Sequence, residues 1–224
     1  MDKLRLQLAI WMETKSNKIK RSVYRKTMRE FLKKHSLQDG IVKPKKDVRY
    51  NPYEGTSLLL IDELIKSNEI KPDEKFVDIG CGAGIFMIYL AMNGFKRLKG
   101  YELDVDLYNI CSKNISTYLN ETQEKPSELE VVHANAVESD MDDDASYFFL
   151  FNTFFDKETY CAWLNKVEES LHRNERKIKI IILYPTIASM GAMRERDWLR
   201  ERGRVACKAQ LCYRCVNFLI YESI

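Results

Sequence analysis

The stretch Phe76–Gly84, which reads FVDIGCGAG, decides the fold of this chain. It begins as a short apolar strand, carries an aspartate at position 78 and continues into three glycines at alternate positions. Glycine adopts positive φ without strain and has no Cβ, so such a turn lets backbone pass close to a nucleotide-like ligand. The apolar segment that follows is predicted to be a helix, Ile85–Asn93, that ends at Gly94.

The glycine spacing separates two classes of cofactor. The dinucleotide fingerprint needs glycine at its first, third and sixth positions, but the sixth position counted from Gly80 is Ile85. Asp78 also suits a ligand with an ammonium group and would repel a pyrophosphate. A nicotinamide enzyme is therefore the weakest interpretation, and a plain tight turn without a ligand is the structural alternative.

A second carboxylate follows at the predicted distance. Glu102 ends the short strand Leu98–Glu102, 22 residues after Gly80. A carboxylate at about this spacing accepts hydrogen bonds from both ribose hydroxyls of an adenosine cofactor. The alternative is a solvated acidic residue at a strand end, which the preceding glycine turn makes the weaker interpretation.

Together these residues resemble motif I and the acidic second strand of the class I S-adenosylmethionine (SAM) dependent methyltransferases. The resemblance implies SAM as cofactor. In the third strand of that family an aspartate often lies near the adenine amino group, and this chain has Asn135 there. The cofactor-binding residues implied are Tyr53, Thr56, Asp78, Gly80, Cys81, Gly82, Gly84, Glu102, Leu103, Asn135, Ala136 and Asn152.

The end of the fourth strand, Tyr147–Phe151, is the position that lies beside the transferable methyl group in these families. Enzymes that methylate amino groups place Asn or Asp, two prolines and an aromatic residue there. This chain keeps Asn152 and Phe155 but has Thr153 and Phe154 in place of the prolines. The resemblance implies catalytic roles for Asn152 and Phe155; alternatively, the two phenylalanines pack and Asn152 caps the next turn.

Further segments resemble a group of small bacterial SAM-dependent methyltransferases whose acceptors are mostly unassigned. They are Arg49–Leu60, the Tyr184 and Pro185 pair, and the last strand Phe218–Glu222. The resemblance covers residues 49–224 and implies that Tyr50 and Tyr53 line or cover the pocket, Tyr50 on the catalytic side.

The first 48 residues form a separate basic helical arm in this interpretation. Residues 1–50 contain 15 Lys or Arg and 5 Asp or Glu, whereas the remaining 174 contain 21 and 28. Apolar side chains recur with helical spacing, so one face can dock while the basic face stays in water. The stripe comprises Ile19, Val23, Thr27 and Phe31, flanked by Met28 and Leu32. The arm suits an acidic or phosphate-bearing partner or an anionic surface, or it is a solvated helix face; we rank a lid or substrate-binding arm first.

Alternating strands and helices predict an α/β fold with a doubly wound, Rossmann-like, seven-stranded sheet, mostly parallel with an antiparallel last strand. The predicted strands are Lys75–Ile79, Leu98–Glu102, Glu130–Ala134, Tyr147–Phe151, Lys177–Tyr184, Val205–Cys212 and Val216–Tyr221. The predicted helices are Glu54–Ser67, Ile85–Asn93, Val105–Leu119, Lys157–His172 and Ile187–Arg202. Residues 49–224 therefore form the catalytic domain.

Composition excludes several other classes. The chain has 45% hydrophobic residues, too many for a disordered protein, and no apolar run near the roughly 20 residues that span a bilayer. Six scattered cysteines are typical of reduced thiols in a cytoplasmic protein. We expect no metal site: the Cys207, Cys212 and Cys215 spacing is only part of a metal pattern, and the aspartates at 140 and 142–144 are expected to lie in a solvated loop.

The predicted function is an enzyme that moves the methyl group of SAM to a nitrogen or oxygen acceptor on a small molecule or protein. A nucleic-acid methyltransferase that uses the basic arm, or a non-catalytic SAM-binding module, is the alternative. The sequence leaves the acceptor and the oligomeric state open.

Overall fold

The computed structural model describes residues 25–40, 53–206 and 217–224. Its centre is a seven-stranded sheet with the order β3-β2-β1-β4-β5-β7-β6. The strands are β1 Lys75–Ile79, β2 Arg97–Glu102, β3 Glu128–His133, β4 Ala145–Phe151, β5 Lys179–Leu183, β6 Leu199–Ala206 and β7 Asn217–Ser223. The first five are parallel, and β7 runs antiparallel to both β5 and β6. The predicted fold class, including the antiparallel last strand, is confirmed.

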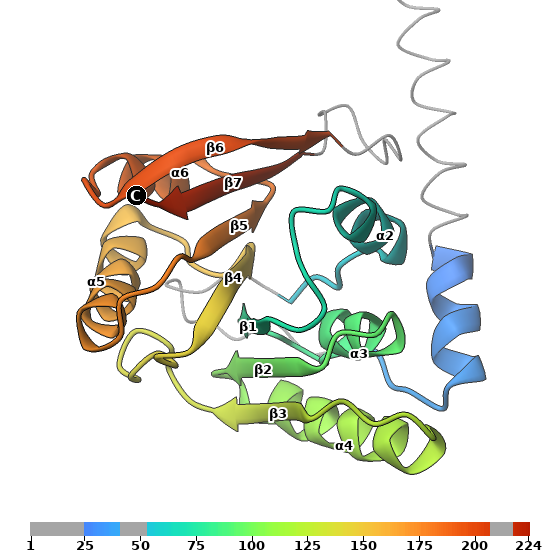
Figure 1. The fold of residues 1–224 in the computed structure, drawn as a ribbon. Helices are drawn as coiled ribbons and strands as arrows, with labels where there is room; N and C mark the ends of the chain where they lie inside the picture. The colour runs from blue at the N-terminus through green and yellow to red at the C-terminus, as the bar shows by residue number, and fades with distance from the viewer. Residues whose placement is uncertain (1–24, 41–52, 207–216) are drawn as a thin grey trace, which may run out of the picture.

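Helices cover both faces of this sheet (Figure 1). They are α2 Leu58–Lys66, α3 Ile85–Met92, α4 Val105–Glu121, α5 Lys157–Arg173 and α6 Ile187–Arg194. One apolar cluster joins α2, α3 and α4 to the sheet, and a second joins α5 and α6 to the opposite face. Because both faces are covered, every residue of β1 is buried, as expected for a central parallel strand.

Two predicted helices are shorter in the structure. Residues 54–57 lie outside α2, which begins at Leu58 after Ser57. The predicted helix Ile187–Arg202 is wrong in its second half, because α6 ends at Arg194 and β6 begins at Leu199. The charged residues from 200 to 204 belong to an edge strand instead, where Arg200 and Arg202 pair with Glu222 on β7. Charged side chains protect such an edge from pairing with another chain.

Residues 25–34 of the N-terminal region form a helix that packs on the domain. Met28 and Leu32 are buried, and Phe31 makes an edge contact with Tyr89 of α3 at 5.6 Å between ring centroids. Lys26 and Arg29 stay exposed. The docked face is thus centred on the residues predicted to flank the stripe; Ile19 and Val23 lie outside the described residues.

The aspartates predicted to lie in a solvated loop instead build an ionic network at the amino ends of β1, β2 and β4. Asp142 is largely buried and accepts from Lys75 Nζ at 3.1 Å and Lys99 Nζ at 2.8 Å. Asp144 pairs with Lys75 and Arg97, and Asp143 pairs with Arg173. Burial alone would favour the neutral Lys75 amine, but its hydrogen bonds to Glu128 and Asp142 raise its pKa. Across the parts of the chain that the structure describes, no cluster of three His, Cys, Asp or Glu is arranged to hold a metal ion.

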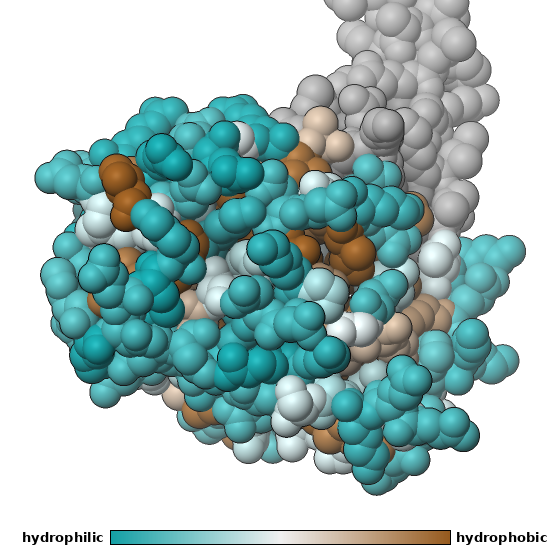
Figure 2. All heavy atoms as spheres, viewed as in Figure 1, coloured by the Kyte–Doolittle hydropathy of each residue, from teal (hydrophilic) through white to brown (hydrophobic). Residues whose placement is uncertain are grey.

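Few large apolar side chains are exposed in the part of the chain that the structure describes. Figure 2 shows one face of the molecule as mostly hydrophilic with separate hydrophobic patches. None of the helices within residues 25–40, 53–206 and 217–224 is long and apolar enough to cross a membrane.

Candidate active site

The loop after β1 has the backbone geometry that its glycines predict. Gly80, Gly82 and Gly84 have φ values of 78°, 56° and 75°, which L side chains rarely adopt. Gly84 is the N-cap of α3, so the loop delivers the chain directly into that helix. A Cβ at Gly82 would lie 2.1 Å from Cε2 of Tyr53, so an aromatic ring already occupies the space that the missing side chain leaves.

Two buried carboxylates flank this loop. Asp78 is 3% exposed at the end of β1, and Glu102 is 7% exposed at the end of β2. Glu102 accepts from the Gly82 amide through Oε2 and from the Asp104 amide through Oε1, each at 2.8 Å. Burial raises the pKa of Glu102, while these backbone donors oppose the shift.

The pKa of the Asp78 carboxyl group is shifted further than that of Glu102. Burial, reinforced by the negative charge of Glu102, raises its pKa well above the ordinary value. The described residues provide no ion pair for either carboxylate. A cationic group brought to Asp78 would therefore compensate a charge that the protein leaves uncompensated.

A buried amide attaches the N-terminal segment to the glycine loop. Asn114 of α4 is 1% exposed. Its Nδ2 donates to the carbonyl oxygens of Ala83 and Gln38, both at 2.9 Å, and its Oδ1 accepts from the Gln38 amide at 2.8 Å. The same segment brings Gly40 against Tyr53, where an added Cβ would lie 2.5 Å from the ring. Tyr53 thus lies between Gly40 and Gly82, over the predicted cofactor loop.

Glycines in and beside the loop leave room for two cysteine side chains. Cys81 and Cys111 are buried free cysteines, and a hydrogen bond to Cys111 together with burial raises the pKa of the Cys81 thiol. An added Cβ at Gly84 would lie 2.5 Å from Cys111 Sγ, and one at Gly100 would lie 2.6 Å from Cys81 Sγ. Gly100 pairs with Asp78 across β1 and β2, so its lack of a side chain makes room for Cys81.

The side chains that follow β2 and β3 are partly exposed and partly held by local hydrogen bonds. Leu103 is 41% exposed, and a ring nitrogen of His133 lies 3.0 Å from its carbonyl oxygen. Asn135 uses its amide locally, accepting from the Val137 amide and donating to Glu138. Ala136 is buried. The structure therefore places Leu103 and Asn135 at the same edge as Glu102, with the Asn135 side chain held in an Asx turn.

The residues after β4 divide between packing and exposure. Phe154 is buried and makes an edge contact with Tyr160, whereas Phe155 is 64% exposed. Asp156, not Asn152, caps α5 by accepting from the Thr159 amide. The structural alternative thus holds for Phe154 and is wrong for Phe155 and Asn152.

Thr153 has a role that the sequence did not indicate. Its hydroxyl donates to the Ile79 carbonyl at 2.8 Å, and its methyl group lies against Gly80. It ties the end of β4 to the end of β1, where a proline could donate no hydrogen bond. Tyr184, after β5, also entered the sequence argument only as part of a resemblance, yet it shares with Asn152 a φ of 53°. Left-handed φ at non-glycine residues occurs often at functional sites.

The remaining residues singled out in the sequence lie before α2 or outside the described residues. Thr56 is buried just before α2, next to the Tyr53 segment. Tyr50, Cys207, Cys212 and Cys215 lie outside the described residues.

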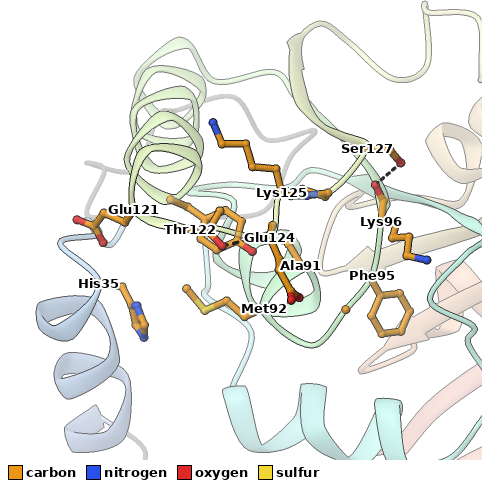
Figure 3. A pocket seen from close by; sticks show the side chains of 13 residues that line it. His35, Ala91, Met92, Phe95, Lys96, Glu121, Thr122, Glu124, Lys125 and Ser127 are labelled. Carbon is orange, nitrogen blue, oxygen red and sulfur yellow. Dashed lines mark hydrogen bonds between the residues drawn. The ribbon is translucent and has the colours of Figure 1, made fainter.

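One hollow of about 600 Å³ lies elsewhere in the molecule (Figure 3). It is lined by the C-terminal ends of α3 and α4, the loop before β3 and His35. These segments lie at the amino ends of the strands, where Ser127 donates to the Lys96 carbonyl at 3.0 Å. It is therefore separate from the predicted site, because ligands of open α/β sheets bind outside the carboxyl ends.

Comparison with solved structures relates this arrangement to known folds. An RNA methyltransferase from Salinibacter ruber in complex with S-adenosyl-L-homocysteine superposes with a TM-score of 0.52 at 15% identity, covering 76% of this chain and 92% of its own. This is the class I methyltransferase fold. Magnesium protoporphyrin IX methyltransferase from Synechocystis with bound SAM gives 0.51 at 12% identity, covering 73% of this chain and 75% of its own.

A third match extends the range of acceptors found on this methyltransferase fold. The Pyrococcus abyssi tRNA (uracil-54, C5)-methyltransferase gives a TM-score of 0.52 at 18% identity over 78% of this chain, which spans 40% of that enzyme. No protein-family model and no curated protein sequence matches the chain.

Proposed function

We propose that this protein transfers the methyl group of SAM to a nitrogen or oxygen acceptor. One observation carries the proposal: a loop of three positive-φ glycines lies between two buried carboxylates, and one of them, Glu102, is fixed to the loop by the Gly82 amide. Solved methyltransferases of this fold with bound SAM or S-adenosyl-L-homocysteine support the choice of cofactor.

The residues present fit such a cofactor. Glu102 has two of its lone pairs occupied by backbone donors, which leaves acceptor capacity for ribose hydroxyls. Asp78 offers a buried carboxylate for the ammonium group of the amino-acid end. We assign Leu103, Asn135 and Ala136 to the adenine side, and Tyr53 and Thr56, with the loop around Cys81, to the amino-acid side.

When bound, SAM would supply an electrophilic methyl group. The lone pair of the acceptor forms the new bond to the methyl carbon, and the electrons of the broken carbon–sulfur bond stay on sulfur, which becomes a neutral thioether. The protein then has to hold the acceptor in line and exclude water. In this proposal the Asn152 carboxamide oxygen and a neighbouring backbone carbonyl accept hydrogen bonds from an acceptor N–H or O–H, which would orient the lone pair and favour loss of the proton. Tyr50 and Phe155 would flank the acceptor.

Isothermal titration calorimetry tests the cofactor assignment directly. We expect S-adenosyl-L-homocysteine to bind the full chain, and Glu102→Gln to weaken that binding at least tenfold. The matched control is Asp73→Asn, which changes an exposed carboxylate whose ion-pair partner among the described residues is the exposed Lys96. Undetectable binding, or a higher affinity for NAD than for SAM, would overturn the proposal.

A nucleic-acid acceptor is the second candidate, and the N-terminal helix supports it. Met28 and Leu32 dock this helix on the domain while Lys26, Arg29 and Lys33 remain exposed on it. An RNA strand bound there would show an affinity that falls steeply with salt concentration, since bound phosphates release counterions. Fluorescence anisotropy with a labelled single-stranded RNA between 50 and about 200 mM salt tests this, with a Lys26→Glu, Arg29→Glu variant as comparison. Bound cofactor without turnover on any nucleic acid, protein or metabolite extract would instead favour the non-catalytic SAM-binding module.

A further inference from the structure

The hollow at the amino ends of the strands is lined by residues that the proposed function does not use (Figure 3). Its volume of about 600 Å³ lies in the range of sites for small organic ligands. Part of the lining is apolar: Ala91 and Met92 end α3, Phe95 follows that helix, and Tyr118 comes from the last turn of α4. A ligand that fits this hollow therefore has an apolar body.

Two helices end at this hollow. α3 ends at Met92 and α4 ends at Glu121, and neither helix has a basic residue in its last turn. The last carbonyl groups of a helix carry a partial negative charge, equivalent to about half an elementary charge. Two such ends beside one hollow favour a cation, and the last turns of the helices themselves supply none.

Two carboxylates of the lining add to this negative charge. Glu121 is the last residue of α4, and Glu124 lies in the loop that follows it. Neither forms an ion pair with another residue that the structure describes. Figure 3 shows Met92 between Glu121 on one side and Phe95 on the other, so charged and apolar groups share the same hollow.

The basic groups of the lining offset only part of this charge. Lys96 is already paired with Asp73 at 2.7 Å. Burial, with a smaller effect from a neighbouring lysine, lowers the pKa of His35, so its imidazole is neutral at pH 7. Lys125 is the one lysine of the lining without an ion pair among the described residues, and in Figure 3 its side chain extends away from Met92.

Tyr118 supplies a polar atom on the apolar side of the hollow. It is 6% exposed, and its hydroxyl forms no hydrogen bond with any described residue. Since Tyr118 lines the hollow, the small accessible part of its side chain faces that space. Buried polar groups are normally hydrogen-bonded, so this hydroxyl points to a donor on a ligand. A phenol oxygen accepts from an ammonium group, and an aromatic ring attracts such a cation to its face.

We propose that this hollow binds a small organic amine, in which a protonated ammonium or guanidinium group is carried on an apolar body. The cationic group would lie between the two helix ends and the carboxylates of Glu121 and Glu124, and the apolar body would lie against Met92 and Phe95. An anion would meet two helix ends and two carboxylates, and an uncharged ligand would leave their charge unbalanced. The inference goes beyond the proposed methyl transfer, because the hollow lies at the opposite ends of the strands from the glycine loop.

NMR titration of the full chain with three matched probes tests the charge preference. The probes 2-phenylethylamine, 2-phenylethanol and phenylacetate each carry one phenyl ring and differ in charge. S-adenosyl-L-homocysteine is present at saturating concentration, so that the amine does not occupy the space beside Asp78. We expect 2-phenylethylamine to bind at least tenfold more tightly than the other two probes. Equal or stronger binding of the alcohol or the carboxylate would overturn the proposal, as would the absence of saturable binding by the amine.

Variants locate the binding. Replacing both carboxylates, with Glu121→Gln and Glu124→Gln in one chain, should weaken 2-phenylethylamine binding at least fivefold. Tyr118→Phe, which keeps the ring and removes the hydroxyl, should weaken it at least twofold. The matched control combines Glu158→Gln and Glu175→Gln, two exposed carboxylates in and after α5 on the other face of the sheet, and should bind within twofold of the unaltered protein.

An undiminished amine affinity in the Glu121→Gln, Glu124→Gln variant would assign the binding to another part of the molecule and overturn the site. The affinity for S-adenosyl-L-homocysteine, measured in parallel, should be the same in all these variants, which also shows that they fold. A protein that binds S-adenosyl-L-homocysteine but not the amine would contradict this inference alone. One that binds the amine, with the expected losses in the variants, but not S-adenosyl-L-homocysteine would support the hollow and contradict the proposed function.

Discussion

The two ends of the same sheet treat buried charge in opposite ways. At the amino ends, Lys75 and Lys99 are largely buried and share the carboxylate of Asp142. Their hydrogen bonds and charges outweigh the effect of burial, so the pKa of Lys99 rises above its usual value and that of Asp142 falls below its usual value. At the carboxyl ends, Asp78 and Glu102 are equally buried, but the described residues pair neither with a cation, and burial raises the pKa of both.

This difference distinguishes charged residues that stabilise the fold from charged residues that are available to bind a ligand. An ion cluster whose members compensate one another stabilises the sheet without reference to anything outside the protein. Two carboxylates left without cations are a cost in the unliganded fold, and a ligand with a cationic group and hydroxyl donors would remove that cost. The comparison predicts that substitutions in the ion cluster at the amino end chiefly lower stability, whereas substitutions around the two carboxylates at the carboxyl end chiefly lower ligand affinity.

The largest expected effect is on stability, from Lys75→Ala. Removing this amine takes one of two lysines from Asp142 and leaves Glu128 only its longer ion pair with Arg97, which should destabilise the protein by about 3 kcal/mol. For a chain of this size that lowers the thermal midpoint by roughly 6–12 °C. Differential scanning calorimetry measures it. Lys96→Ala is the control, since that exposed pair with Asp73 should contribute little. A Lys75→Ala midpoint equal to that of the control would show that the network is not stabilising.

The next effect is on binding, from Gly82→Ala. The new methyl group would overlap the Tyr53 ring at a position whose φ is already unfavourable, so the loop must shift. We expect the affinity for S-adenosyl-L-homocysteine to fall at least tenfold, which is about 1.4 kcal/mol. Gly94→Ala is a close control: its φ is 87°, but nothing lies within 4 Å of the added Cβ. Equal losses in both variants would mean that backbone strain, not the crowded cradle, governs the affinity.

Smaller effects in opposite directions are expected for Asp78→Asn: higher stability and weaker cofactor binding. The folded pKa of Asp78 is raised, so its favourable contribution is complete below the unfolded pKa of about 3.9 and is lost as pH rises through the folded pKa. The amide avoids this loss, and the variant should be more stable than the parent protein by about 1 kcal/mol at pH 8, with the gap narrowing toward pH 5. The same change should weaken S-adenosyl-L-homocysteine binding.

Chemical denaturation at several pH values and calorimetric titration, run on one preparation, measure both halves of this prediction. A variant that is more stable and binds as tightly as the parent protein would remove Asp78 from the cofactor site. A variant less stable at pH 8 would mean that its carboxylate is compensated inside the protein.

Local patterns in the sequence predicted the centre of this molecule well. Strand β1 has the predicted bounds Lys75–Ile79, and Glu102 ends β2 as predicted. The structure adds that Glu102 accepts a hydrogen bond from the Gly82 amide. Each of these features, an apolar strand, a glycine turn and an acidic strand end, is determined by a short stretch of neighbouring residues. The antiparallel last strand was expected from the resemblance to the methyltransferase family, and β7 pairs antiparallel with β5.

The features that were missed depend on contacts between distant segments. Asn114 looks like an ordinary polar helix residue until α4 brings it against Ala83 and Gln38. The charges of β6 are explained by partners on distant segments, Glu222 on β7 and Glu69 after α2. The aspartates before β4 are explained by cations on β1, β2 and α5. A residue whose role is to satisfy a partner far along the chain leaves no local period or spacing by which to identify it.

Thr153 is the sharpest example, and it gives the smallest predicted effect. It stands where related motifs have proline, and its hydroxyl joins the ends of β4 and β1 through the Ile79 carbonyl. Thr153→Val keeps the shape but loses this hydrogen bond, which should destabilise the protein by about 1 kcal/mol. Thr153→Ser keeps the hydroxyl and should retain that bond while losing a methyl contact with Gly80. If the hydroxyl positions the Asn152 turn beside the cofactor loop, then Thr153→Val alone should also weaken S-adenosyl-L-homocysteine binding, by a few-fold; equal affinities in the two variants would confine Thr153 to a purely structural role.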